Sequence, residues 1–354
     1  MELDSRIVFY DPICPAPYSR ATLQQRGLGG SEACVVRIAE ALGACVMQHC
    51  RTTTDGIFRP PSSATNVEHV IVVRDARALH DVRLLFPTAR LYVWLHDLAA
   101  PGSTRARWLT SSSKYLGGVT LVCVSDFLCA RIAAVVDPLD MANEVDVRTI
   151  YNPIDDDLAA GAAAIDDDKL VFLSSPNKGL SYALTAFQAI RKVIPGLRLF
   201  VANPGYRIIE SQAVPNVVWL GTLPFAQAVA HASSALGVLM PNILLPETFG
   251  LVFAESNAVG TPVITHDVGA AREVLHAANP VLPIRSRQKS FARLARQFGV
   301  RAPHFLSGVG LRLGVFDDYI ETIRAWRNGQ RPKVTAEPRF RLSFVAQQWR
   351  QLLS

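Results

Sequence analysis

Two glutamates are separated by seven intervening residues in the segment Pro246-Glu247-Thr248-Phe249-Gly250-Leu251-Val252-Phe253-Ala254-Glu255. The first is predicted to follow an apolar strand in a loop, and the second to lie about one turn into a helix that begins near Gly250. A glycine at a helix start lets a ligand approach the backbone, and the N–H groups of the first helical turn bind anions. Carboxylates would repel a diphosphate, so we expect both glutamates to accept hydrogen bonds from ribose and sugar hydroxyls. The combination indicates a sugar nucleotide site, although either glutamate alone is also typical of a solvated surface position.

The elements that must position these residues follow from an alternation of short β-rich runs and helical stretches. In the first half we predict strands at 7–10, 70–73, 91–95 and 121–124, and a helix at 31–42. In the second half we predict strands at 170–173, 197–202, 217–220, 235–240 and 262–265, and helices at 180–193, at 225–234 and from about 250. This alternation predicts an α/β protein with two parallel sheets, each covered by helices.

The predicted boundary between the two halves lies near residues 150 to 170. Tyr151-Asn152-Pro153 is a turn, and the acidic triplets Asp155 to Asp157 and Asp166 to Asp168 flank an alanine-rich piece. The triplets contain D-x-D, which binds metal in other proteins, but we interpret them as solvated acidic runs of an interdomain connection and predict no metal site. We therefore expect domains at 1–150 and 151–335, followed by a terminal segment at 336–354. Its amphipathic helix is predicted to bury Phe344, Trp349 and Leu352 or Leu353.

Composition limits the class of protein. The chain has 354 residues, 49% of them hydrophobic, which suits two domains. No run approaches the roughly 18 apolar residues of a membrane span and no signal peptide pattern is present, so we expect a cytoplasmic protein. Six cysteines without a C-x-x-C pair argue against disulfides and zinc. The net charge of +6 is compatible with an anionic substrate or with peripheral contact with an anionic membrane, whereas the dispersed arginines disfavour nucleic acid as a partner.

The segment Pro246 to Ile264 resembles the E-x7-E segment of the retaining glycosyltransferases with the GT-B fold, often called family 4. The resemblance spans nearly the whole chain, and it implies two Rossmann-like domains that face a central cleft and a C-terminal helix that crosses back to the first domain. The other matching segments are Gly27-Leu28-Gly29-Gly30-Ser31-Glu32 (the glycine-rich loop), Leu95-His96-Asp97 (the strand-end histidine), Ser174 to Leu180 (the lysine-glycine loop), Val217 to Pro241 (a strand-helix-strand), Asp267 to Val274 (a glycine followed by glutamate) and Phe344 to Leu353 (the crossing helix).

In the second domain the resemblance implies roles in holding the donor. Glu255 would bind the ribose hydroxyls and Glu247 those of the transferred sugar. The backbone at Phe249, Gly250 and Leu251 would meet the phosphates or the sugar. Lys178 would neutralise the diphosphate, whose leaving oxygen gains negative charge as the glycosidic bond breaks.

In the first domain the resemblance implies that Gly29 and Gly30 let a loop close on the distal phosphate. His96 would contact the donor sugar, so His96, Lys178 and Glu247 are the expected catalytic residues. Arg105 and Arg107 follow the His96 loop and are candidates for binding an anionic acceptor, although exposed arginines usually only increase solubility.

The sequence departs from the family at one basic position. An arginine usually stands about five residues before the lysine, but here the stretch is Phe172-Leu173-Ser174-Ser175-Pro176. Either Ser174 and Ser175 donate hydroxyl groups to the phosphates, or another basic residue such as Arg272 substitutes, or the site is weakened.

The resemblance implies retaining, metal-independent transfer of a sugar from a nucleoside diphosphate sugar, with no cofactor. The acceptor would be a glycan, lipid-linked or protein-bound, or another hydroxyl compound. Two alternatives remain: a degenerate protein that binds a sugar nucleotide or glycan without turnover, and a nucleotide-sugar epimerase on the same scaffold. A dehydrogenase is disfavoured because Gly27, Gly29 and Gly30 do not have the G-x-G-x-x-G spacing.

Overall fold

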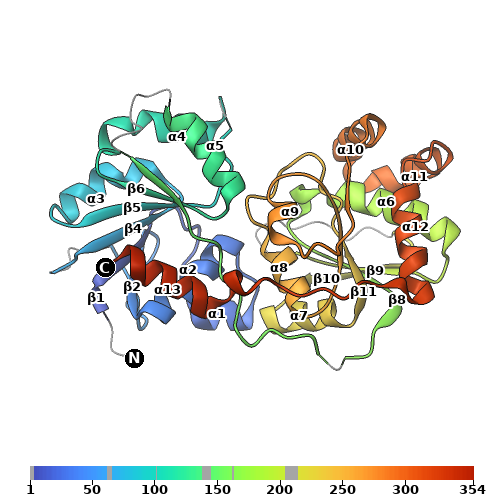
Figure 1. The fold of residues 1–354 in the computed structure, drawn as a ribbon, viewed down its shortest axis with the longest axis horizontal. Helices are drawn as coiled ribbons and strands as arrows, with labels where there is room; N and C mark the ends of the chain where they lie inside the picture. Colours follow the sequence, from blue (N-terminus) through green and yellow to red (C-terminus); the bar gives the residue numbers. More distant parts are fainter. Residues whose placement is uncertain (1–3, 62–65, 101, 138–144, 162, 204–213) are drawn as a thin grey trace. The chain divides into compact units, whose positions relative to one another are not determined.

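The computed structural model describes residues 4–61, 66–100, 102–137, 145–161, 163–203 and 214–354 (Figure 1). The chain forms two compact units. The first comprises Met1–Leu23, Gly30–Asp156 and Pro338–Ser354, and the second comprises Gln24–Gly29 and Asp157–Glu337. Figure 1 shows a sheet flanked by helices in each unit, which confirms the expected pair of Rossmann-like α/β units.

The first unit is built on a seven-stranded sheet with the order β3-β2-β1-β4-β5-β6-β7, and its strand ladders are parallel. Strands β1, β2, β4, β5 and β6 carry runs of buried apolar residues, as expected where helices cover both faces of a parallel sheet. The strands are β1 (Asp4–Asp11), β2 (Ala44–Gln48), β3 (Phe58–Arg59), β4 (His69–Val73), β5 (Arg90–Leu95), β6 (Thr120–Cys123) and β7 (Asp146–Thr149). The helices in this part are α1 (Arg20–Gln25), α2 (Gly30–Leu42), α3 (Leu79–Leu85), α4 (Thr104–Ser111), α5 (Asp126–Val136) and α13 (Leu342–Leu352).

The second unit is built on a six-stranded parallel sheet with the order β10-β9-β8-β11-β12-β13. The strands are β8 (Asp166–Leu173), β9 (Arg198–Asn203), β10 (Val217–Thr222), β11 (Ala235–Leu239), β12 (Val263–His266) and β13 (Val281–Leu282). The helices are α6 (Leu180–Val193), α7 (Phe225–Ser233), α8 (Leu251–Ala258), α9 (Ala271–Val274), α10 (Ser286–Phe298), α11 (Ala302–Arg312) and α12 (Asp317–Ala325). In this order β8, β11 and β12 are neighbours, so the loops that follow them meet at one edge of the sheet.

The C-terminal helix α13 belongs to the first unit and packs against α2, as the resemblance implied. Trp349 is fully buried, with its ring 5.2 Å from that of Trp94. The expectation that Phe344 is buried is wrong, because its side chain is 44% exposed and Val345 takes the inward position instead. Val345 and Trp349 are one helical turn apart and therefore lie on the same face of α13. Because Trp349 is buried, this face points into the core.

The acidic triplets are not merely solvated. Asp155 forms an ion pair at 2.9 Å with Arg37, whose side chain is 1% exposed, and Asp156 accepts a hydrogen bond from the backbone of Ser343. The second triplet is not part of a connection, because it forms the beginning of β8. There Arg198 pairs with Asp166 at 2.6 Å and Arg327 with Asp168 at 2.7 Å, which offsets the charge of the strand.

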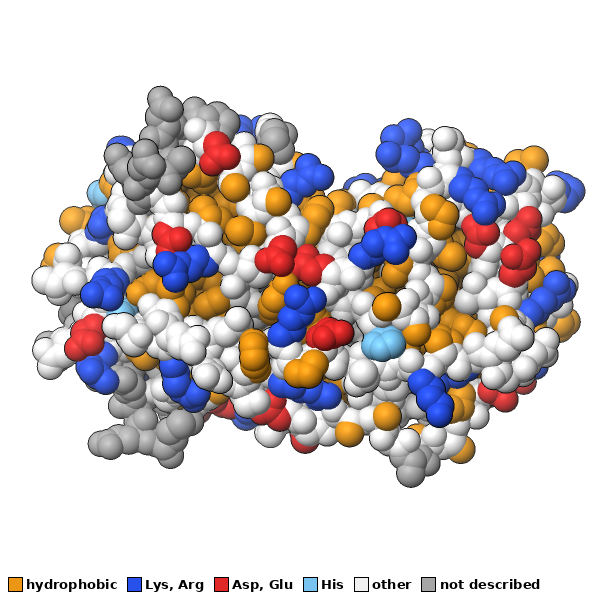
Figure 2. Space-filling model, viewed as in Figure 1, with side chains coloured by type: hydrophobic (Ala, Val, Ile, Leu, Met, Phe, Trp, Pro, Cys, Tyr) orange, Lys and Arg blue, Asp and Glu red, His pale blue; other side chains and the backbone are white. Residues whose placement is uncertain are grey.

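No helix among the described residues is long and apolar enough to cross a membrane. Figure 2 shows one face of the molecule, on which basic, acidic and hydrophobic side chains are intermixed.

Candidate functional site

An ion pair connects two loops at the edge of the second sheet. After β8 a single turn at Pro176–Lys178 leads into α6, and Gly179 joins them with φ of +100°, which favours glycine. The Nζ of Lys178 lies 2.6 Å from Oε2 of Glu247, in the loop between β11 and α8. The fold thus brings together two of the three residues expected to be catalytic.

The Glu247 carboxylate is deeply buried, with only 3% of the residue exposed. Oε2 is paired with Lys178, whereas Oε1 is buried and accepts no hydrogen bond from any described residue. A buried acceptor without a partner costs about 1 to 3 kcal/mol. Such a group is a common feature of sites that bind a polar ligand.

The backbone of Glu247 is held by the loop after β12. Its carbonyl oxygen accepts a hydrogen bond from the N–H of Ala270 at 2.9 Å, and Glu247 and Gly269 form an isolated parallel bridge. Gly269 has φ of +69°, and a Cβ there would lie 2.3 Å from the carbonyl oxygen of Glu247. This close approach explains the glycine in the predicted glycine-then-glutamate element.

Helix α8 begins at Leu251 behind Gly250, which has φ of +89°. A Cβ at Gly250 would lie 2.6 Å from the Phe253 ring, so this turn also requires glycine. Phe249 is buried beside it, and Glu255 lies half-buried on the second turn of α8. The site thus has the helix N-terminus that the sequence predicted, with its N–H groups pointing out of the helix.

The serines before Lys178 are positioned differently from each other. Ser175 is buried and donates its hydroxyl to the Asn177 side chain, whereas Ser174 is half-buried. Arg272, the substitute suggested by the sequence, is exposed and paired with Asp267 at 2.7 Å.

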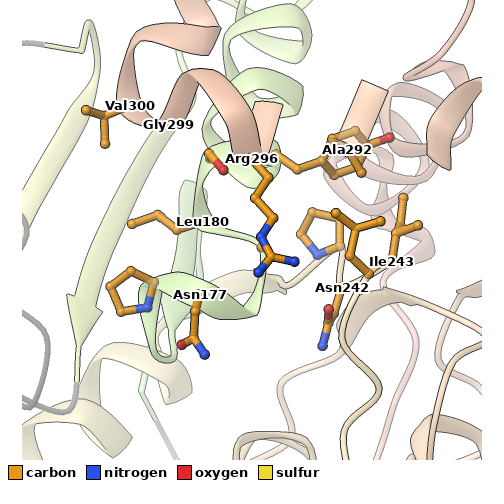
Figure 3. A pocket seen from close by; sticks show the side chains of 14 residues that line it. Asn177, Leu180, Asn242, Ile243, Ala292, Arg296, Gly299 and Val300 are labelled. Carbon is orange, nitrogen blue, oxygen red and sulfur yellow. The ribbon is translucent and has the colours of Figure 1, made fainter. Parts of the chain in front are cut away.

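A pocket of about 300 Å³ lies beside the turn that precedes α6. Asn177, Gly179 and Asn242 line it, and of its lining residues Arg296, from α10, is the basic one. Figure 3 shows the Arg296 guanidinium extending into the region between Asn177 and Asn242. Arg296 was not predicted as a site residue, and no signal in the sequence connects it with Lys178.

In the first unit the residue pair His96-Asp97 follows β5, and a charge network surrounds it. Arg74, at the end of β4, lies 3.1 Å from Asp97 and 3.5 Å from Glu32, and Arg105 lies 2.9 Å from Asp97. Burial raises the pKa of Asp97, but Arg74 and Arg105 outweigh this effect and the net pKa is lowered. Sequence reasoning missed Arg74, although its position after a predicted strand could have indicated it. Its φ of +69° is unusual for a residue with a side chain.

His96 is a neutral histidine. Burial, and then the Arg74 guanidinium, lower the pKa of His96 to about 3. Its imidazole therefore does not carry a charge near neutral pH, and its polar contacts are those of a neutral ring. Its ring centroid lies 4.5 Å from that of Trp94.

The predicted acceptor residues make contacts within their own unit. Besides pairing with Asp97, Arg105 stacks on Trp108 at 4.2 Å, and Arg107 donates to the carbonyl of Gly102 and the hydroxyl of Thr104. Gly30 is the first residue of α2, whereas Gly29 groups with the second unit. No group of three or more His, Cys, Asp or Glu side chains suited to a metal ion occurs among the described residues.

Residues 167–298 match the family described as glycosyl transferases group 1. The second unit is a group 1 glycosyltransferase domain. A curated relative, a phosphatidyl-myo-inositol mannosyltransferase of Mycobacterium leprae, is 35% identical over 104 residues. That match covers 28% of this chain and 28% of the relative.

Solved structures extend the likeness in fold to the full length of the chain. The Anabaena protein HepE, solved with UDP-glucose, has a TM-score of 0.61 at 15% identity and covers 98% of this chain and 99% of its own. The trehalose 6-phosphate synthase of Burkholderia multivorans has a TM-score of 0.61 at 10% identity. This match covers 99% of this chain and 96% of the synthase. The sucrose-phosphate synthase of Thermosynechococcus elongatus has a TM-score of 0.60 at 14% identity, and the match covers 98% of each chain. At these identities the likeness shows the fold, which is GT-B.

We predict that Gly269→Ala disrupts the Glu247 loop of this glycosyltransferase domain, because the new Cβ would meet backbone atoms that cannot move independently. Its matched control is Gly329→Ala, where φ is +83° and nothing lies within 4 Å. Both substitutions carry the cost of a left-handed backbone, about 1 to 2 kcal/mol. Urea denaturation should show an additional loss of about 1 to 3 kcal/mol for Gly269→Ala. Equal losses in the two variants would contradict the close contact.

We also predict that the buried neutral His96 makes the protein less stable in acid. In the unfolded chain His96 binds a proton below its ordinary pKa of about 6.5, whereas in the folded chain it does so only near pH 3. The unfolded state therefore gains protons first, and stability falls as the pH decreases from 6.5 toward 3. Between pH 7 and pH 5 this contributes a loss of about 2 kcal/mol. Urea denaturation at both pH values should show a correspondingly smaller loss in His96→Gln, and an unchanged loss would refute the prediction.

Proposed function

We propose that this chain transfers a sugar from a nucleoside diphosphate sugar to a hydroxyl acceptor, with retention of anomeric configuration and without a metal. The membership of the second unit in the group 1 glycosyltransferases supports this reaction class. The observation that carries the proposal is the buried Glu247 carboxylate, with Lys178 at one oxygen and no described donor at the other.

The geometry of Glu247 suits a sugar hydroxyl. A hydroxyl donated to Oε1 would satisfy the buried acceptor, while the Lys178 ammonium already occupies Oε2. The ion pair also fixes the Lys178 ammonium at the sheet edge near the start of α8. The diphosphate is then expected at the N-terminus of α8, where the helix dipole favours negative charge, and the ribose at Glu255.

The proposed step transfers the glycosyl group in one direction and a proton in the other, so two bonds break and two form. The acceptor hydroxyl attacks the anomeric carbon on the face from which the diphosphate leaves, and the bond from that carbon to the phosphate oxygen breaks. The acceptor proton passes to the departing phosphate oxygen, so a protein base is not required. Lys178 and the helix N-terminus stabilise the charge that develops on the leaving group. His96, which is neutral, contributes a hydrogen bond to the donor sugar rather than a proton.

The class of acceptor is proposed from the relatives. The Mycobacterium leprae enzyme is named for phosphatidyl-myo-inositol, which is a membrane lipid. A lipid-linked hydroxyl acceptor is therefore the first class to test, ahead of soluble glycans. The HepE structure contains UDP-glucose, which makes UDP-sugars the first donors to test.

We predict that Glu247→Gln lowers the rate of sugar transfer about 100-fold or more, because the amide keeps the shape but loses the charge that binds the hydroxyl and Lys178. We would measure donor binding by calorimetry. We would also measure transfer and hydrolysis of UDP-, GDP- and ADP-sugars, each with and without EDTA. The matched control is Glu321→Gln, an exposed position on α12. EDTA is expected to leave the rate unchanged.

The same panel discriminates the rival functions. Donor binding by the unaltered chain without hydrolysis or transfer would establish a binding protein. Isomerised donor in the absence of acceptor would establish an epimerase. Either result overturns the transferase.

We also propose that Arg296 compensates for the arginine that the loop before Lys178 lacks, because it extends into the pocket beside that loop. Arg296→Ala is predicted to weaken donor binding about 3- to 10-fold, a modest effect since the side chain is exposed and partly screened. Arg293→Ala, one turn earlier on α10 and outside the pocket lining, is the matched control. Equal affinities in the two variants would refute the role of Arg296.

A further inference from the structure

Helices α10 and α11 carry an exposed apolar strip that consists of Leu294, Phe298, Phe305, Val309 and Leu313. These side chains are 38% to 52% exposed, and they make up half of the ten large hydrophobic side chains that the described residues expose. Their spacing of four residues along each helix aligns Leu294 with Phe298, and Phe305 with Val309 and Leu313. The strip is thus two apolar ridges rather than scattered residues.

The two ridges meet along one seam. The rings of Phe298 and Phe305 are in edge contact, with centroids 4.9 Å apart, at the end where α10 leads into α11. At the other end, Arg287 on α10 donates to the carbonyl of Leu313 at 2.8 Å. Contacts at both ends align the helices antiparallel, so the apolar side chains form one continuous surface.

The strip is additional to the packing faces of these helices. On α10, residues such as Phe291, Ala292 and Ala295 are already buried, and on α11 Ala302 and Leu306 are. The strip therefore lies beside the faces that bind the rest of the unit. Monomeric proteins seldom expose a contiguous apolar patch without using it.

The stretch of chain that forms the strip carries formal charges of one sign, and the nearest carboxylates in the sequence, Asp317 and Asp318, follow it. The sequence from 274 to 316 contains no Asp or Glu, but it contains the basic residues Arg285, Arg287, Lys289, Arg293, Arg296, Arg301 and Arg312. On α11, Arg312 follows Val309 by three residues, and Arg301 precedes Phe305 by four. Helical geometry places both beside the strip. Figure 2 shows basic and hydrophobic side chains together over α10 and α11.

We propose that the α10–α11 surface binds an anionic lipid bilayer, with the strip inserted at the boundary between headgroups and acyl chains and Arg301 and Arg312 on the lipid phosphates. Helices with an apolar face and a basic rim adopt this orientation at membranes. Charge favours a bilayer over a second copy of the chain, because two such surfaces facing each other would bring arginines together. This binding is separate from the proposed sugar transfer and does not require it.

The test is sedimentation of the full chain with vesicles of phosphatidylcholine alone, or mixed with phosphatidylglycerol, in the absence of any sugar nucleotide. The chain is expected to bind the mixed vesicles more tightly and to lose affinity at high salt. The double variant Phe298→Ser with Phe305→Ser should bind at least about 10-fold more weakly, because less apolar area enters the bilayer. Arg301→Glu with Arg312→Glu should also weaken binding, and only to the mixed vesicles.

The matched control is Leu84→Ser with Phe344→Ser, two exposed apolar positions in the first unit. This control should bind the mixed vesicles as tightly as the unaltered chain does. Glu247→Gln should also bind the mixed vesicles as tightly, which separates membrane binding from the proposed sugar transfer. Circular dichroism melting would verify that each variant is folded. Failure of the unaltered chain to bind mixed vesicles, or equal loss in the control, would overturn the proposal. A dimer in light scattering that the strip variant dissociates would assign the surface to a second copy instead, and overturn it as well.

Discussion

The Lys178–Glu247 ion pair is the interaction on which the site depends. It joins the loops after β8 and β11, and the loop after β12 holds the backbone of Glu247 through Gly269 and Ala270. Three adjacent strand ends therefore meet at Glu247, where the loop after β12 contacts the backbone and the loop after β8 contacts the carboxylate. Because that carboxylate is buried, removal of its partner would leave an uncompensated charge in the interior, which is far more costly than the loss of a surface pair. The residues proposed for chemistry are thus also the residues that hold this edge of the sheet together.

Much of this arrangement could be predicted from local sequence. The helix at 180–193 was predicted with the observed bounds, because its apolar periodicity and the adjacent glycine and proline mark both ends. The helix after Glu247 could also be predicted, because Gly250 marks its beginning. Lys178 and Glu247 were assigned to one donor site by the family resemblance, and they meet at one sheet edge because both follow the C-terminal ends of parallel strands.

The remaining features depend on contacts between residues far apart in the chain. Lys178 and Glu247 are 69 positions apart and Arg37 and Asp155 are 118 apart, so neither ion pair leaves a mark in a local pattern. The same holds for Arg296, which approaches the Asn177 turn only through the packing of α10 against α6. The exposure of Phe344 is also decided at a distance, since Trp94 and Phe9 determine which face of α13 turns inward. Periodicity identifies an amphipathic helix but does not distinguish its core residue from a neighbour of similar hydropathy.

The return of the chain through Pro338–Ser354 makes the first unit discontinuous in sequence. Trp349 completes the aromatic cluster with Phe9 and Trp94, and the isolated Ile154–Arg341 bridge holds the returning segment beside the departing one. During synthesis, all of Asp157–Glu337 is translated before these residues are added. The first unit therefore cannot complete its fold until the whole of the second unit has been translated. Until α13 has been translated and docked, the surface of α2 that it covers stays exposed, and an exposed apolar surface makes a nascent chain prone to aggregate or to bind a chaperone.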